Sequence, residues 1–162
     1  MQDSQRVWVF DLDDTLHDAS SHIFPVMNKA MTQYIMDTLD LDEHHAFELR
    51  KHYWRIYGAT LKGLMRHHGV DPYHFLCKTH DHMDLENMVT EIKQLRHCIN
   101  GLNGRKVIFT NAPMNYAIRV LDTLGITDLF SLVFSVESTK FHPKPSVRGF
   151  KQLLRAIKAN PS

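Results

Sequence analysis

The sequence has few cysteines, almost no net charge and no long apolar run. Its two cysteines, Cys77 and Cys98, form no CxxC pair, which argues against a disulfide framework and predicts free thiols. Basic and acidic residues nearly cancel, 19 against 18, so no bulk attraction to nucleic acid or membranes is expected. No apolar stretch approaches the roughly 20 residues of a membrane span, and residues 1–6 lack the apolar segment of a secretory signal. We therefore expect a cytoplasmic protein with neither a nucleic-acid polymer nor a membrane as partner.

Histidine, by contrast, is abundant, with 12 copies. Many lie in polar segments of helical pattern: His44, His45, His52, His67, His68, His80 and His82. The pair His80 and His82 has two potential metal donors, but no HExxH motif or cysteine–histidine spacing supplies a third. We predict that these histidines lie on solvated helix surfaces.

Short apolar runs alternate with amphipathic segments along the chain. Residues 6–10, 105–109 and 132–136 are rich in β-branched and aromatic residues and are predicted to be buried strands. Apolar residues at helical spacing predict one helix over 85–99, another over 117–124 and a last one that Pro145 opens. Strands that alternate with helices predict an α/β fold with a three-layer, Rossmann-like parallel sheet.

The segment from about 20 to 80 has helical spacing throughout. Gly58, Gly69 and the Asp71-Pro72 pair interrupt the pattern and separate its helices. We predict a small helical module with its own apolar seam, inserted between the first and second strands.

Polar residues follow each predicted strand. Asp11 and Asp13 come after the first strand, Thr110 and Asn111 after the second, and Lys144 after the third and a short loop. In open parallel sheets, ligands bind beyond the carboxyl ends of the strands. We therefore expect these five side chains to gather at one edge of the sheet.

These residue types suit phosphoryl transfer. Asp11 and Asp13 are two residues apart and can point to the same side, where a hard cation such as Mg²⁺ would offset their repulsion. One carboxylate can attack phosphorus, and the other can protonate the leaving oxygen and then activate water. Thr110 and Asn111 offer neutral donors to phosphate oxygens, and Lys144 offers a positive charge.

Three segments, in this order, resemble the motifs of the haloacid dehalogenase superfamily. Residues 10–16, FDLDDTL, resemble its first motif, residues 110–112 its second, and the Lys144-Pro145 pair its third. Residues 17–84 resemble the helical cap of that superfamily, with 1–16 and 85–162 as its α/β core. Residues 53–58, YWRIYG, and the segment FTNA at 109–112 are similar to the pyrimidine 5′-nucleotidase branch.

The resemblance implies a role for each residue. Asp11 would be the nucleophile and a magnesium ligand, and Asp13 the general acid and base that also gives magnesium its backbone carbonyl. Thr110 would bind the phosphoryl group with Asn111 beside it, and Lys144 would stabilise the phospho-aspartate. The dehalogenases of the superfamily lack the second aspartate, so Asp13 favours phosphate chemistry on a small phosphorylated metabolite, with a nucleoside 5′-monophosphate preferred.

A fourth motif of the superfamily, an acidic pair after a further strand, is not seen before the sequence ends at Ser162. We expect that the chain is a fragment of a longer product that supplies the remaining Mg²⁺ ligand, or that a homo-oligomer covers the first strand, which would otherwise be an exposed edge. Two alternatives to the nucleotidase hypothesis stay open. One is a sugar-phosphate phosphatase or phosphomutase of the same superfamily, and the other is a non-catalytic module that binds phosphate or a partner.

Overall fold

The computed structural model describes residues 6–90 and 92–158, so the sequence end at 160–162 lies outside the described residues. The chain divides into two compact units. The first comprises Met1–Ser20 and Leu85–Ser162, and the second is Ser21–Asp84. The loop that follows the first strand, up to Ser20, therefore lies with the sheet.

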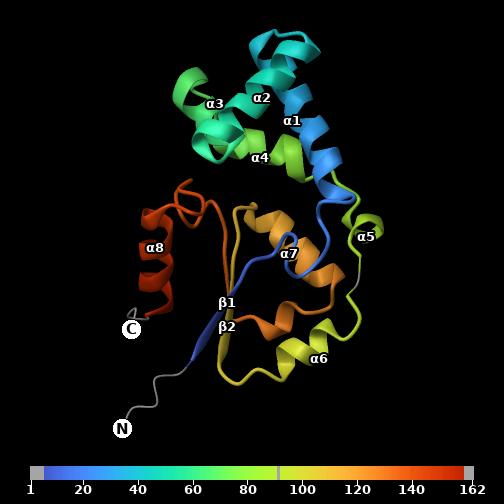
Figure 1. Ribbon diagram of the computed structural model, residues 1–162, viewed down its shortest axis with the longest axis vertical. Coiled ribbons are helices and arrows are strands. Elements are labelled where there is room, and N and C mark those ends of the chain that lie inside the picture. Colours follow the sequence, from blue (N-terminus) through green and yellow to red (C-terminus); the bar gives the residue numbers. More distant parts are fainter. Residues whose placement is uncertain (1–5, 91, 159–162) are drawn as a thin grey trace. The chain divides into compact units, whose positions relative to one another are not determined.

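Three parallel strands form the sheet of the first unit, in the order β1-β2-β3 (Figure 1). They are β1 (Val7–Phe10), β2 (Arg105–Phe109) and β3 (Leu132–Phe134). The parallel α/β sheet predicted from the sequence is confirmed. Strand β3 ends two residues earlier than predicted, because the Ser135 amide donates to the Ser138 hydroxyl rather than to a neighbouring strand.

Helices cover both faces of this sheet (Figure 1). On one side, α8 (Val147–Ile157) packs Leu153 and Ile157 against Val107 and Phe109 of β2. Side chains alternate along a strand, so the fully buried Ile108 faces the other side. There α7 (Met114–Thr123) follows β2 and contacts β3, and the short 3-10 helix η1 (Thr127–Leu129) leads into β3.

The helix predicted over 85–99 is wrong. The structure has two short helices in its place, α5 (Leu85–Met88) and α6 (Leu95–Asn100). Gln94, directly before α6, has φ of 66°, a left-handed conformation that a continuous right-handed helix cannot include. Of the apolar residues at helical spacing, Leu85 in α5 and Ile99 in α6 are buried, whereas Ile92 between the two helices is exposed.

Four helices form the second unit: α1 (Ile23–Leu39), α2 (Glu43–Tyr57), α3 (Thr60–His68) and α4 (Pro72–His80). Two of these helices are capped by an aspartate at their N-terminus. The side chains of Asp42 and Asp71 accept hydrogen bonds from the amides of His45 and His74, and so cap α2 and α4. No helix among the described residues is long and apolar enough to cross a membrane.

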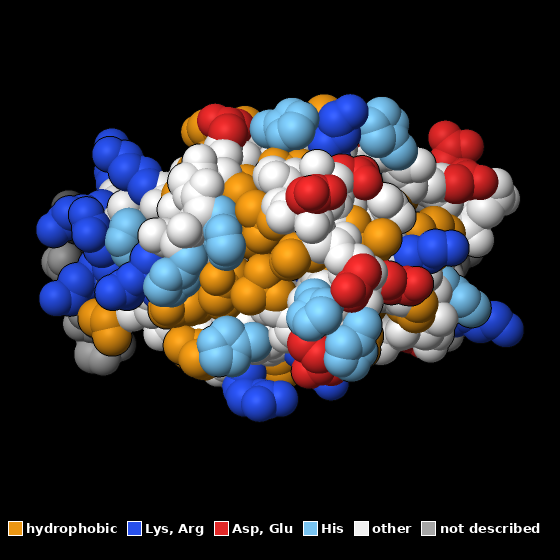
Figure 2. Space-filling view, turned by 90° about the horizontal axis from the view of Figure 1, so that it is seen from above, with side chains coloured by type: hydrophobic (Ala, Val, Ile, Leu, Met, Phe, Trp, Pro, Cys, Tyr) orange, Lys and Arg blue, Asp and Glu red, His pale blue; other side chains and the backbone are white. Residues whose placement is uncertain are grey.

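On the face shown in Figure 2, several histidine side chains lie among apolar ones. The prediction of solvated histidines is nevertheless wrong for His80, which is 4% exposed and hydrogen-bonded to the Thr79 hydroxyl. His67 and His68 are each hydrogen-bonded to a tyrosine hydroxyl, those of Tyr57 and Tyr53. The two cysteines are free thiols, as predicted.

Candidate active site

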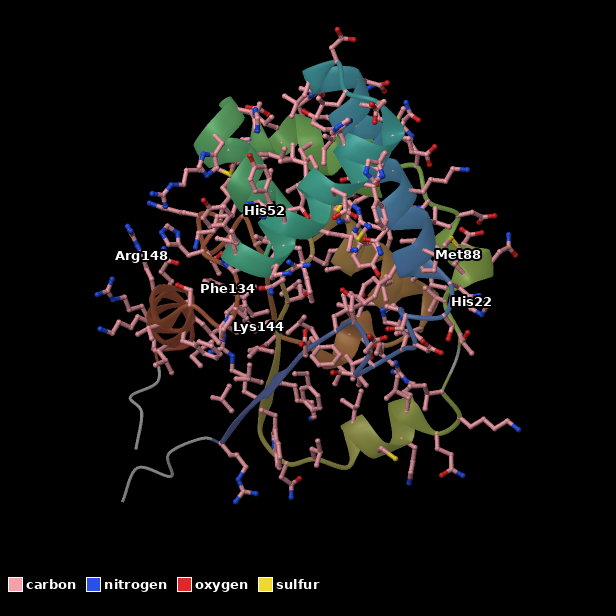
Figure 3. The ribbon with its side chains drawn as sticks, turned by 45° about the horizontal axis from the view of Figure 1, so that its top comes forward. His22, His52, Met88, Phe134, Lys144 and Arg148 are labelled. Carbon is pink, nitrogen blue, oxygen red and sulfur yellow. The ribbon has the colours of Figure 1, made fainter. Side chains whose placement is uncertain are left out.

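An ion pair joins the residue after β1 to the loop that precedes α8. Lys144 Nζ lies 2.6 Å from Asp11 Oδ1. The same ammonium donates to the carbonyl of Phe109, the last residue of β2, at 2.7 Å. Lys144 thus links the exits of two neighbouring strands and is held close to both (Figure 3).

Asn111 fixes the backbone of Lys144. Its Oδ1 accepts from the Lys144 amide at 2.7 Å, and its Nδ2 donates to the Lys144 carbonyl at 3.2 Å. Both ends of the Asn111 side chain are therefore engaged with one residue. This arrangement fixes the backbone of Lys144, a role of Asn111 that the sequence did not predict, and the contact of Asn111 with substrate stays a prediction.

Thr110 lies between Phe109 and Asn111 with its side chain buried, at 1% exposure. Its backbone amide donates to the Phe134 carbonyl, which extends the pairing of β2 with β3 by one bond. Its Oγ1 accepts from the Ala112 amide at 3.0 Å. A hydroxyl can accept and donate at once, so the Thr110 hydroxyl still has a proton to donate.

The carboxyl of Asp13 is held by two side chains that sequence reasoning missed. The Tyr116 hydroxyl, on α7, donates to Asp13 Oδ1 at 2.7 Å, and His17 Nε2 lies 3.0 Å from the same oxygen. Burial and the adjacent Asp13 carboxylate raise the pKa of Tyr116 above its usual value, so the phenol stays protonated. His17 stands four residues after Asp13, a spacing that could have been noticed, but no local signal links Tyr116 to Asp13.

The loop after β1 is closed by Asp14. Its Oδ1 accepts from the amides of Ala19 and Ser20, and its Oδ2 accepts from the Ser20 hydroxyl at 2.6 Å. Hydrogen bonding by Ser20 is the main cause that lowers the pKa of Asp14. The hydrogen bonds from Ala19 and Ser20 to Asp14 fix the C-terminal end of the turn that carries Asp13 and His17.

The oxygen donors at this edge suit a hard divalent cation. Among residues 6–90 and 92–158, no group of three or more histidine, cysteine or acidic side chains is placed to hold a metal. A closed zinc site, which needs four ligands, does not fit here. Mg²⁺ commonly takes one or two carboxylates and completes its shell with water and substrate phosphate, and the Asp11 side chain is 47% exposed. The donor set therefore suits Mg²⁺ bound together with a phosphorylated ligand.

The five residues singled out in the sequence fall into two linked groups. Lys144 contacts Asp11 directly and is clamped by Asn111, and Thr110 lies between that clamp and β2. Asp13 belongs to the same loop as Asp11, but its carboxyl turns toward His17 and Tyr116.

The family model of haloacid dehalogenase-like hydrolases matches residues 8–162. The chain belongs to this family. Phosphate metabolism protein 8 from Saccharomyces cerevisiae is 28% identical to this chain over 135 residues, which cover 78% of the chain and 42% of that protein. The chain thus spans less than half the length of this curated relative.

Solved structures share the fold of this family member at low identity. A haloacid dehalogenase-like family protein from Streptococcus pneumoniae has a TM-score of 0.58 and 15% identity, covering 96% of this chain and 71% of its own. The hydrolase YfnB from Bacillus subtilis, bound to magnesium, has a TM-score of 0.53 and 16% identity, covering 97% and 74%. At such identities the likeness concerns the fold.

Proposed function

We propose that this chain is the phosphatase part of a haloacid dehalogenase-like hydrolase and acts through an aspartyl-phosphate on Asp11. The observation that carries the proposal is the 2.6 Å contact between Lys144 Nζ and Asp11 Oδ1 at the strand exits. A fixed cation beside a half-exposed carboxylate is the arrangement needed to accept a phosphoryl group and to stabilise its charge.

The two oxygens of Asp11 have different surroundings. Oδ1 accepts from the Leu12 amide at 2.8 Å and from Lys144. Oδ2 has no hydrogen bond to any residue that the structure describes, so it is the oxygen open for attack on phosphorus. In that step the bond from Oδ2 to phosphorus forms and the bond from phosphorus to the leaving oxygen breaks.

Asp13 would act as the general acid in the first half of the reaction and as the general base in the second. Its carboxyl gives a proton to the leaving oxygen in the first half and takes one from the attacking water in the second. Water then breaks the bond between Asp11 and phosphorus and releases phosphate. The Asp11 carboxylate and the Asp13 backbone carbonyl would hold Mg²⁺, which when bound supplies positive charge to the phosphoryl oxygens.

We propose a small phosphorylated metabolite as substrate, with a nucleoside 5′-monophosphate preferred. In the helical unit, which would act as the cap, Tyr53 is buried whereas Trp54 is 65% exposed. An exposed indole is suited to stacking on the flat π face of a nucleobase. Trp54, rather than Tyr53, is therefore the aromatic side chain to test for nucleotide preference.

Phosphate release with and without Mg²⁺ tests the proposal. We expect the chain to hydrolyse nucleoside 5′-monophosphates faster than sugar phosphates, and to stop when EDTA removes the metal. Asp11→Asn should abolish turnover, because the amide is not a nucleophile, while Asp37→Asn on α1 should keep it. Phosphate release that persists in Asp11→Asn would overturn the proposal. Mg²⁺-dependent binding of phosphate without turnover in the wild type would instead favour a non-catalytic module.

We also propose a second copy of the chain as the partner that covers β1. Within the described residues, β1 pairs only with β2, so its other edge has no strand beside it. Val9 in the middle of β1 is 46% exposed. An uncovered apolar edge strand tends to associate.

A further inference from the structure

We propose that Tyr116 and His17 are positioning residues that decide which oxygen of Asp13 carries the catalytic proton. This inference rests on the proposed function, because it concerns the acid and base of that reaction. It starts from a single oxygen. Asp13 Oδ1 receives the Tyr116 hydroxyl at 2.7 Å and faces His17 Nε2 at 3.0 Å. Asp13 Oδ2 has no hydrogen bond to any residue within 6–90 or 92–158.

The surroundings of His17 indicate which of its nitrogens carries the proton. The ring is 1% exposed, and its Nδ1 is buried without a hydrogen-bond partner among the described residues. A proton on Nδ1 would be a buried donor without an acceptor, which is costlier and rarer than a lone pair without a donor. The proton therefore sits on Nε2, and His17 donates to Asp13 Oδ1.

Two donors on Oδ1 leave Oδ2 as the oxygen that binds a proton. A proton on Oδ1 would break one of the two hydrogen bonds and strand a polar group beside a buried ring. When the leaving oxygen departs from phosphorus, the proton passes from Asp13 Oδ2 to that oxygen. When water attacks the aspartyl-phosphate, the same Oδ2 takes its proton.

The two donors come from different parts of the chain. His17 lies on the loop after β1, and Tyr116 lies in the first turn of α7, 103 residues away from Asp13. Tyr116 is 0% exposed and His17 only 1%, so neither side chain has room to turn away. The carboxyl is thereby held in one orientation before substrate binds, which is the preorganisation that acid–base catalysis needs.

The test compares two substrates that differ in their need for an acid. The leaving group of an alkyl phosphate is a strongly basic alkoxide, which needs the proton. The leaving group of 4-nitrophenyl phosphate is a stable phenolate, which does not. The ratio kcat/KM reports the steps up to phosphoryl transfer to Asp11. In Tyr116→Phe we expect kcat/KM for an alkyl phosphate to fall about tenfold, a fraction of the roughly 100-fold or more that acid–base catalysis contributes. For 4-nitrophenyl phosphate we expect a fall of less than about threefold, because that step does not use the acid.

Two further variants separate positioning from packing. His17→Gln keeps an N–H donor at similar reach and should retain most activity, whereas His17→Leu should behave like Tyr116→Phe. Tyr34→Phe is the matched control, because it removes a tyrosine hydroxyl bonded to His74 instead of Asp13. In Tyr34→Phe, kcat/KM for the alkyl phosphate divided by kcat/KM for 4-nitrophenyl phosphate should equal the wild-type value. Thermal unfolding of each variant checks that it is folded.

The outcomes separate this inference from the proposed function. If Tyr116→Phe loses alkyl and aryl phosphate turnover in equal proportion relative to an active wild type, the positioning role is overturned while the phosphatase stands. The same holds if Tyr116→Phe changes neither. If the wild type releases phosphate from neither substrate, or if Asp11→Asn remains active, the proposed function fails and the inference fails with it.

Discussion

The titration of Asp14 gives a prediction at the scale of single residues. Hydrogen bonds from Ser20 lower the pKa of Asp14 from its ordinary value of 3.8, so the ionised carboxylate is favoured by folding. The sign follows from linkage. The contribution is fully present above pH 3.8 and is lost as pH falls below 3.8 toward the folded pKa. We expect the wild type to have a higher melting temperature than Ser20→Ala at pH 6, with a difference that shrinks below pH 3.8.

Asp14→Asn provides the matched control for this effect. The amide keeps an oxygen that can accept from the Ala19 and Ser20 amides but does not titrate. Adding Ser20→Ala to Asp14→Asn should therefore change the melting temperature equally at pH 3 and pH 6. A difference between wild type and Ser20→Ala that stays constant over this range would contradict the role of the Asp14 charge.

At the scale of elements, Gly149 lets α8 approach the loop that carries Lys144. A Cβ at this position would lie 2.6 Å from the carbonyl oxygen of His142, and backbone cannot easily give way. We expect Gly149→Ala to destabilise the fold by about 1–3 kcal/mol, as overpacking does, in denaturant unfolding. The added methyl group would displace the 142–146 loop, which carries Lys144. We therefore expect the protein that remains folded to release phosphate more slowly.

Gly101→Ala is the control for the addition of a methyl group. Gly101 ends α6 with φ of −68°, and the nearest atoms to its Cβ would be 3.6 Å away. Alanine fits this conformation and restricts the unfolded chain, so the variant should be as stable as the wild type or slightly more so. Equal stability of Gly149→Ala and Gly101→Ala would show that α8 has room to move.

Element by element, the sequence predicts what local chemistry determines. Residues 105–109 form β2 with the predicted bounds, because a β-branched run stands between Gly104 and the polar Thr110. The break between α5 and α6 was not predicted, since a left-handed Gln94 has no compositional mark. Likewise, Asp11 and Lys144 follow from residue type and strand order, whereas Tyr116 reaches Asp13 only through the packing of α7. Side chains that meet only through tertiary packing have no characteristic separation in the sequence, so their contact cannot be predicted from it.

At the scale of the whole molecule, one edge of the sheet has no strand beside it among residues 6–90 and 92–158. Strand β1 occupies one end of the order β1-β2-β3, and its residues are half-buried or exposed. On α8, Val147 and Phe150 are also exposed, at 68% and 43%. Apolar surface beside unpaired backbone groups favours association. The sheet was predicted from the sequence with β1 at such an edge, and the described residues place it there.

Light scattering on purified protein tests whether a second copy covers this edge. We expect the wild type to have about twice the chain mass of 18.9 kDa, and Val9→Lys to be a monomer, because a charge in an edge strand opposes strand pairing. Val26→Lys on α1 is the matched control, since Val26 is exposed to the same extent, 47% against 46% for Val9. A wild type that is monomeric at all concentrations would contradict the homo-oligomer. Dissociation of Val26→Lys as well as Val9→Lys would locate the contact away from β1, because only Val9 lies in the strand that has an unpaired edge among the described residues.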